Sequence, residues 1–326
     1  MKMSSPGHPS AFQRGAIGLD VGGTKIAGGF VTFPSGRVLI RQTIPTLPQR
    51  GGDAVLADAL ALAKRLIVKA EASGLSVRGI GIGVAELVDL HGNVTSSQTI
   101  AWRGMPIQAS FNHLAPAVVE SDVRAAALAE ATWGAGRAFR NFVYVTVGTG
   151  VSYSLVLNGR PYTGTRGNAL ILASGALTYT CPQCGMTSHI VPEEIASGPG
   201  LVAHYAQKRP GQAVRGEDVM IAAAAGDPIA IEVVRMAGHV LGNCVGWLVN
   251  VLDPEAVIVG GGLGLAGGLY WDSFIAAARQ HIWADTSRTL PILPAELGVE
   301  AGLIGAAATV WLRREKMEIK RHSRLH

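Results

Sequence analysis

The segment that most constrains the fold is Asp20-Val-Gly-Gly-Thr-Lys25, which directly follows the apolar run Ala16–Leu19. It predicts a strand that ends in a glycine turn and returns as a second strand. The glycines let backbone N–H groups approach an anionic oxygen closely, while Thr24 adds a hydroxyl and Lys25 a charge. Asp20 is placed to hold a hydrated Mg²⁺. We interpret the segment as a phosphate-binding hairpin; the alternative is an ordinary Gly-Gly turn with a surface carboxylate.

A second unit of this kind lies further along the chain. The strand-like run Phe142–Val147 leads into Gly148-Thr149-Gly150, and the run Ser152–Leu157 follows. Another glycine turn, Gly260-Gly261-Gly262, follows the buried strand Ala256–Val259 and leaves room for adenine and ribose. Strand meanders followed by helices therefore occur twice, as a coarse internal duplication. Two α/β halves with facing glycine turns predict a nucleotide cleft at the carboxyl ends of the strands.

Domain boundaries follow from this duplication. We expect a loose polar segment over residues 1–14, an N-terminal α/β domain over 15–122 and a C-terminal α/β domain over 123–301. The Ala-rich terminal helix, within about 302–326, is expected to complete the N-terminal domain. The composition, 48% apolar and 16% charged with 42 glycines, is typical of a compact α/β protein.

Composition and charge also limit the classes of partner that we expect. We find no apolar run of membrane-span length and no secretion leader, and three cysteines make no disulfide framework, so we expect a cytoplasmic protein. The net charge of +5 is partly concentrated in the tail Arg313–Arg324. We read this tail as the solvated end of a helix in preference to a nucleic-acid patch, because no aromatic residues are interleaved with it. A small molecule is therefore the expected partner, without nucleic acid or membrane.

The carboxylate that we expect to do chemistry is Asp122. Ser121-Asp122 stands at a corner between the short strand Val118–Glu120 and the helix Val123–Thr132. Phosphoryl transfer to a hydroxyl requires a group that positions the oxygen and accepts its proton, and one aspartate at the mouth of a cleft can do both. The alternative, an N-cap of the helix, is compatible with this role.

Several segments together resemble the ROK family of sugar kinases and repressors, particularly its glucokinases and N-acetylmannosamine kinases. The segments are Ala16–Gly29, Gly79–Asp89, Glu120–Gly136, Val143–Gly167, Cys181–Gly198 and Asp253–Gly262. The resemblance covers about residues 15 to 314 and implies a two-domain, actin-like ATPase fold of ribonuclease H-like topology with an interdomain cleft. Too few residues precede Ala16 for the helix-turn-helix module of the repressors, so we expect a kinase.

The resemblance assigns roles to individual residues. It implies ATP and Mg²⁺ as cofactors, a homodimer as the usual assembly, and Asp122 as the catalytic base. It implies a first phosphate motif of Asp20, Gly22, Gly23, Thr24 and Lys25. A second phosphate motif comprises Gly148, Thr149 and Gly150, and an adenosine motif comprises Gly260, Gly261 and Gly262.

Departures from the family pattern fall on the sugar side. Ser121 replaces an Asn, and Ala85-Glu86 replaces a Pro-Gly. The segment Asn168–Gly175 lacks the Glu-x-Gly-His whose Glu and His grip the sugar near its anomeric end. Either the acceptor is not an ordinary aldohexose, or the chain is a catalytically silent sensor of nucleotide or sugar. The retained Asp122 favours the first explanation, with a C7 cyclitol or an amino- or keto-modified sugar as acceptor.

Four further residues are substrate-binding candidates. Glu86 either supplies a replacement contact to a hydroxyl or amine, or is an exposed turn residue. A family Glu that approaches the sugar corresponds to Glu193 or Glu194, and the spacing before Ala196 does not choose between them. Trp102-Arg-Gly-Met-Pro106 resembles the loop that covers the sugar pocket, with Gly104 near the substrate beside Ser121 and Asp122.

Cys181-Pro-Gln-Cys184 is half of a tetrahedral zinc site by its spacing. His189 stands where the family has a third Cys, so Cys181, Cys184 and His189 are the candidate ligands of a structural zinc. The alternative is a vestigial knuckle with two free thiols. Cys244, on an apolar helix, is expected to be a core residue.

Overall fold

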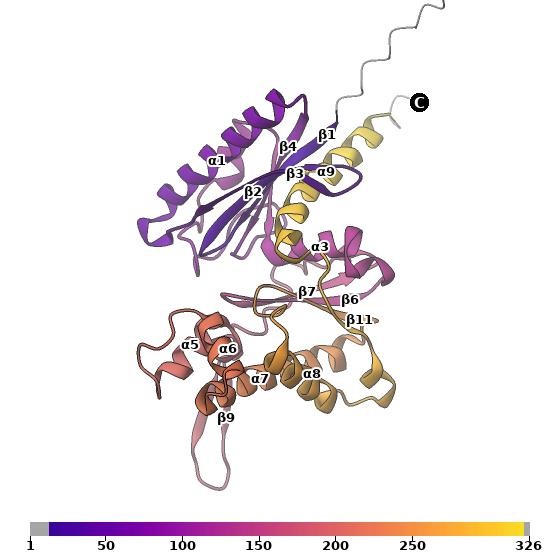
Figure 1. Ribbon diagram of the computed structural model, residues 1–326. Helices are drawn as coiled ribbons and strands as arrows, with labels where there is room; N and C mark the ends of the chain where they lie inside the picture. Colours follow the sequence, from indigo (N-terminus) through magenta and orange to yellow (C-terminus); the bar gives the residue numbers. More distant parts are fainter. Residues whose placement is uncertain (1–12, 323–326) are drawn as a thin grey trace, which may run out of the picture.

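The computed structural model describes residues 13–322, and its side chains as far as residue 315. It contains two five-stranded sheets and a separate two-stranded hairpin (Figure 1). The first sheet comprises β1 (Arg14–Val21), β2 (Lys25–Thr32), β3 (Arg37–Pro45), β4 (Ser76–Val84) and β5 (Ala117–Ser121). The second comprises β6 (Phe142–Val147), β7 (Val151–Leu157), β8 (Arg160–Pro161), β11 (Ala256–Gly260) and β12 (Ile292–Pro294).

The two sheets share one topology. The strand order is β3-β2-β1-β4-β5 in the first and β8-β7-β6-β11-β12 in the second. In each sheet the first three strands along the chain are antiparallel, and the last two run parallel to the first. The duplication expected from the glycine turns is therefore present in the connectivity of the whole molecule.

Nine α-helices occur within residues 13–322. They are α1 (Gly52–Ala72), α2 (Ile107–Asn112), α3 (Asp122–Trp133), α4 (Pro192–Ala196), α5 (Gly198–Ala206), α6 (Gly216–Ala224), α7 (Pro228–Leu252), α8 (Gly268–His281) and α9 (Ala301–His322). Short 3-10 helices span Pro48–Arg50, Ala135–Ala138, Asp285–Thr289 and Gly298–Glu300. The hairpin of β9 (Leu177–Thr180) and β10 (Thr187–Ile190) projects from the second half (Figure 1).

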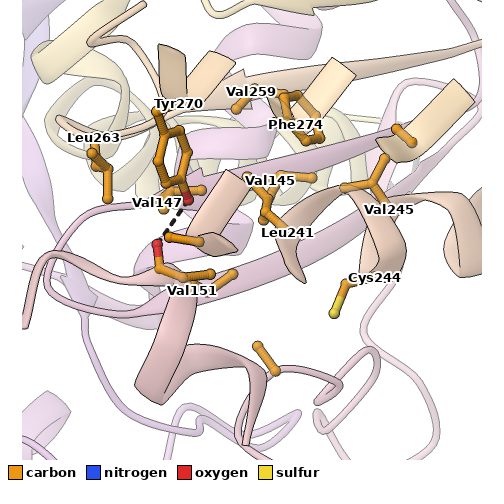
Figure 2. Packing of buried hydrophobic residues seen from close by; sticks show 14 of the residues in the cluster. Val145, Val147, Val151, Leu241, Cys244, Val245, Val259, Leu263, Tyr270 and Phe274 are labelled. Atoms are coloured by element: carbon orange, nitrogen blue, oxygen red, sulfur yellow. Dashed lines mark hydrogen bonds between the residues drawn. The ribbon is translucent and has the colours of Figure 1, made fainter. Parts of the chain in front are cut away.

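Helices α7 and α8 cover the outer face of the second sheet. Alternate residues of its strands face them, including Val145 and Val147 of β6 and Val259 of β11. Figure 2 shows these valines against Leu241 of α7 and Phe274 of α8. The period of two along each strand thus sends one set of side chains into this core and leaves the other set for the opposite face.

The first sheet is sandwiched between α1 and α9. Its larger apolar side chains, such as Ile17 and Ile82, pack with α1. Glycines face α9: a Cβ at Gly18 would lie 2.1 Å from the carbonyl oxygen of Leu303, and a Cβ at Gly81 would lie 1.6 Å from that of Ala306. The alternation of glycine with branched residues in β1 and β4 therefore lets α9 approach the backbone of the sheet. On this packing we propose that α9 belongs to the N-terminal domain.

Helix α3 lies between the two sheets. Its Ala129 packs with residues of α9, whereas Val123 and Ala126 pack with Phe142 and other side chains on the inner face of the second sheet. In Figure 1 it occupies the middle of the molecule. The first residue of α3 consequently stands where the two halves meet.

Helix α7 corrects one expectation from composition. Among the described helices it alone is long and apolar enough to cross a membrane, with a mean hydropathy of 1.2 over its most apolar window. Of that window, 56% is buried within the protein. The helix packs on the second sheet and against α8, and burial on a protein core explains an apolar composition without a membrane.

Candidate active site

A cavity of about 380 Å³ lies between the two halves. Gly22 and Gly23 of the β1–β2 turn line it from one side, and the β6–β7 turn, Gly148–Gly150, lines it from the other. Asp20 and Asp122 also line it. The structure thus brings together the two glycine turns and the carboxylate that the sequence placed far apart.

Asp122 is the first residue of α3, and Ser121 is its N-cap. The Val123 N–H donates to Asp122 Oδ1 over 2.6 Å. Burial and the negative charge of Asp20 raise the pKa of Asp122 to about 7. A carboxyl group with such a pKa can take up a proton near neutral pH.

Asp20, the penultimate residue of β1, lies on the face that carries Gly18, which is the face toward α9. Its carboxylate lies against Gly302 in the first turn of that helix. Burial raises the pKa of Asp20 to about 6, and the nearby charge of Lys25 partly offsets this. A half-buried carboxylate whose charge is only partly compensated fits a divalent cation, since Mg²⁺ is commonly held by one or two carboxylates together with phosphate oxygens and water.

The first glycine turn is only partly exposed to the cavity. Gly22 and Gly23 line it, whereas Thr24 and Lys25 are exposed and lie outside the lining residues. The Gly22 N–H donates to the carbonyl of Lys25 over 3.1 Å, which closes the turn. Lys25 acts on the cavity through its charge near Asp20.

The second glycine turn is held by its neighbours. The Gly148 N–H donates to the Gly150 carbonyl, and the Gly148 carbonyl accepts from the Gly198 N–H at the start of α5. The turn Gly260–Gly262 packs behind it, since a Cβ at Gly261 would lie 2.3 Å from the Val147 carbonyl oxygen. Gly260, Gly261 and Gly262 do not line the cavity, and the Cβ direction of Gly262 is open.

Glu86 lines the cavity but is neither exposed nor free. It is 6% exposed, and both oxygens of its carboxylate are engaged. Oε1 accepts from the N–H groups of Thr99 and Ile100, and Oε2 accepts from the Ser96 hydroxyl and the Gln98 N–H. The interpretation as an exposed turn residue is therefore wrong. Because four donors occupy the carboxylate, its contacts fix the loop of residues 96–100 and leave it no lone pair for an acceptor hydroxyl.

The structure distinguishes the two adjacent glutamates. Glu193 lines the cavity, and its Oε2 accepts from the Val151 N–H over 2.8 Å. Glu194 is exposed and lies outside the lining residues. Gly104 also lies outside them, with a φ of +74°. Beside it, Trp102 is fully buried in the first core, with its indole N–H donating to the Gly52 carbonyl.

The segment in place of Glu-x-Gly-His forms an apolar part of the cavity wall. Its lining residues are Ala169, Leu170, Ile171, Leu172, Ala173 and Ser174. Leu170 and Leu172 pack against the core of the second half. This part of the wall carries no carboxylate or imidazole that could hold a sugar hydroxyl.

The predicted zinc ligands do not converge. In the β9–β10 hairpin His189 pairs with Thr178, at the end of the ladder away from Cys181, and its Nδ1 lies 2.9 Å from the Thr178 hydroxyl. No group of three or more His, Cys, Asp or Glu side chains within residues 13–322 is placed to hold a metal ion. Three ligands from Cys181, Cys184 and His189 are thus not assembled by this hairpin. Cys244 is buried, as expected.

Arg124 is a cavity residue that the sequence did not single out. It is 7% exposed, and its guanidinium donates to the Val88 carbonyl (2.8 Å) and to the Gly167 carbonyl (2.5 Å). It also pairs with Glu120. Because Val88 and Gly167 belong to different halves, Arg124 joins the two sides of the cleft. An arginine at a helix start carries no local signal for this role.

Comparison with known proteins agrees with this geometry. The sequence profile described as "ROK family" matches residues 16–313. The chain belongs to the ROK family. It is 31% identical to a glucokinase of Streptomyces coelicolor over 89% of its own length and 96% of that of the relative. It is 30% identical to the bifunctional enzyme NanE/NanK of Brucella melitensis, covering 53% of that longer protein.

Solved structures support the fold assignment. A ROK family glucokinase of Streptomyces griseus, crystallised with glucose and AMPPNP, matches with a TM-score of 0.77 and 31% identity. The match covers 90% of this chain and 98% of that one. The actin-like ATPase fold with an interdomain cleft, expected from the sequence, is therefore confirmed for this ROK chain.

Proposed function

We propose that this ROK chain is an ATP- and Mg²⁺-dependent kinase. It transfers a phosphoryl group to a hydroxyl of a hexose-like sugar or a cyclitol, and we expect that hydroxyl to be primary. The observation that carries the proposal is the meeting of Asp122 with both glycine turns in one cavity. The glucokinase relatives, one of them crystallised with a nucleotide analogue and a sugar, support the same chemistry.

Each element of the cleft has a defined task in this proposal. The N–H groups of Gly23, Thr149 and Gly150 donate to phosphate oxygens, while those of Gly22 and Gly148 close the two turns, and Asp20 holds the metal. Mg²⁺, when bound, neutralises charge that develops on the phosphates. Asp122 accepts the proton of the acceptor hydroxyl as its oxygen bonds to the terminal phosphorus and the bond from phosphorus to ADP breaks. The pKa of Asp122, about 7, suits a proton acceptor near neutral pH.

For the acceptor we retain two classes, a modified hexose and a C7 cyclitol. The wall segment Ala169–Ala173 lacks polar grips, which favours a ring without a hemiacetal at that end. Besides the base Asp122, we propose Glu193 as the carboxylate that contacts the acceptor, since Glu86 already accepts four hydrogen bonds.

The decisive experiment compares the wild type with D122N in a phosphorylation assay against hexoses, hexosamines and C7 cyclitols. We expect turnover to fall at least ~10³-fold for D122N, with AMPPNP affinity unchanged, because the proton acceptor is removed while the phosphate turns remain. E194Q, which replaces an exposed carboxylate near the cleft, is the matched control. Turnover of D122N near the wild-type rate would exclude Asp122 as the base.

The same assay addresses the rival function, a sensor that binds nucleotide or sugar without turnover. The loss of Glu-x-Gly-His is the observation in its favour. Binding of AMPPNP and of a sugar by the wild type, without phosphorylation of any acceptor, would replace the kinase proposal with the sensor.

A further inference from the structure

One buried polar atom in the cleft lacks a partner. Ser154 of β7 is 2% exposed, and its hydroxyl has no hydrogen bond to any described residue. The residue lines the cavity between the two halves. Buried hydroxyls are nearly always hydrogen-bonded, so an unpaired one beside a cavity indicates a group that arrives with a ligand.

Tyr153, the other residue with an unpaired buried hydroxyl in the described chain, has a different explanation. Side chains alternate along β7, and Tyr153 belongs to the core beneath α7 and α8. There its hydroxyl faces the thiol of Cys244, a weak partner. Of these two unpaired hydroxyls, only that of Ser154 is on the inner face of the sheet.

The inner face of the second sheet carries a row of hydroxyls. Thr146 pairs with Ser152 and Tyr144 pairs with Ser154 across β6 and β7, so all four side chains share one face. Tyr144 packs with Val123 of α3, which identifies this face as the one against the helix that begins with Asp122. Thr146, Ser152 and Ser154 all line the cavity. Hydroxyls that donate and accept are well suited to a polyol.

The polar row contrasts with the apolar segment Ala169–Ala173 in the same cavity. We propose that Ser154 binds a hydroxyl of the acceptor, and that the acceptor is a polyhydroxylated ring with one hydroxyl-poor edge that contacts Ala169–Ala173. Ser154 thus takes up part of the task of the absent Glu and His. The inference rests on the proposed function, which identifies the bound ring as the acceptor of the phosphoryl group. Binding of the ring by Ser154 does not itself depend on turnover.

The test combines one variant with a series of acceptors. Binding of glucose, a C7 cyclitol and their monodeoxy analogues is measured by calorimetry in the presence of AMPPNP, for the wild type and for S154A. We expect S154A to bind the preferred parent ring about tenfold more weakly than the wild type does, with AMPPNP affinity unchanged. We also expect one monodeoxy analogue to bind S154A and the wild type equally tightly. S188A, an exposed serine on β10, is the matched control.

Thermal unfolding separates binding from a structural role. Because the hydroxyl is unpaired without ligand, S154A is expected to melt at the same temperature as the wild type or above it. A lower melting temperature of S154A with unchanged affinities would overturn the proposal. An equal loss of affinity for the parent ring and for every analogue would also overturn it, as would a wild type that binds no ring. Binding as expected without phosphorylation would retain the role of Ser154 and refute the kinase function.

Discussion

The carboxylate of Asp20 occupies space that only a glycine at position 302 leaves open: a Cβ there would lie 2.5 Å from Asp20 Oδ2. Gly302 is in the first turn of α9, which begins at Ala301, whereas Asp20 is the penultimate residue of β1. The backbone N–H groups of a helix start favour a negative charge. Two elements near opposite ends of the described residues, β1 and α9, therefore both contribute to the proposed metal site.

Replacing Gly302 by Ala is expected to displace the Asp20 carboxylate and to weaken Mg²⁺-dependent binding of AMPPNP at least ~10-fold, measured by calorimetry. Alanine favours helix by about 0.5–1 kcal/mol over glycine, so helix propensity alone would act in the opposite direction. G175A, at an exposed glycine whose nearest Cβ contact is 3.8 Å, is the control. Equal nucleotide affinity in G302A and G175A would contradict the assignment of Asp20.

Asp20 and Asp122 should titrate as interacting groups. Since the charge of Asp20 raises the pKa of Asp122, D20N is expected to lower the pKa of Asp122 from about 7. Titration of ¹³C-labelled aspartate carboxyls by NMR in the metal-free protein measures this directly. In the wild type, kcat/KM for the acceptor should rise with pH as Asp122 ionises. An Asp122 midpoint that is equal in D20N and wild type would show that the two groups do not interact.

The stability of D122N should depend on pH relative to the wild type. The pKa of Asp122 rises from 3.8 to about 7 on folding, so its contribution to stability is fully present below pH 3.8 and is lost as pH rises through 7. Asparagine does not titrate. The free energy of unfolding of D122N relative to the wild type is therefore expected to increase by about 4 kcal/mol between pH 4 and pH 8. Urea titrations at both pH values measure it, and a pH-independent difference would refute the raised pKa.

Glu86 should act through the loop of residues 96–100. In E86Q one amide N–H₂ meets backbone N–H donors, so we expect a loss of about 1–3 kcal/mol in the free energy of unfolding and an increased KM for the acceptor. Urea denaturation and steady-state kinetics measure the two effects. E194Q, at an exposed position, provides the reference. If E86Q were as stable as E194Q, the four hydrogen bonds to Glu86 would have little energetic weight.

Much of the fold could be predicted because its signals are local. The glycine turns and the strands that flank them are visible in short windows of sequence, and the apolar helix expected around Cys244 is α7. Helix α8 was missed although it spans fourteen residues, and so were the short elements α2, α4, β9, β10 and β12. The short ones have too few residues for a periodicity, and tertiary contacts determine their conformation.

The candidate site was predictable where spacing carries the information and unpredictable where partners come from far along the chain. Asp20, Asp122 and the turns at Gly22 and Gly148 do meet in one cavity. Glu86 was misinterpreted because its donors lie ten to fourteen residues away in a loop without a motif. The bonds of Arg124 to Val88 and Gly167 join three separate segments, which no local pattern reveals.

The return of α9 to the first sheet has a consequence for synthesis of the protein. The strands of that sheet are complete at Ser121, but Ala16, Ala27 and Val31 remain uncovered until residues 301–310 are available. The second sheet and its helices, by contrast, are complete at Pro294. On the ribosome the later half can therefore close its core before the earlier half, the reverse of the order in which the two are translated.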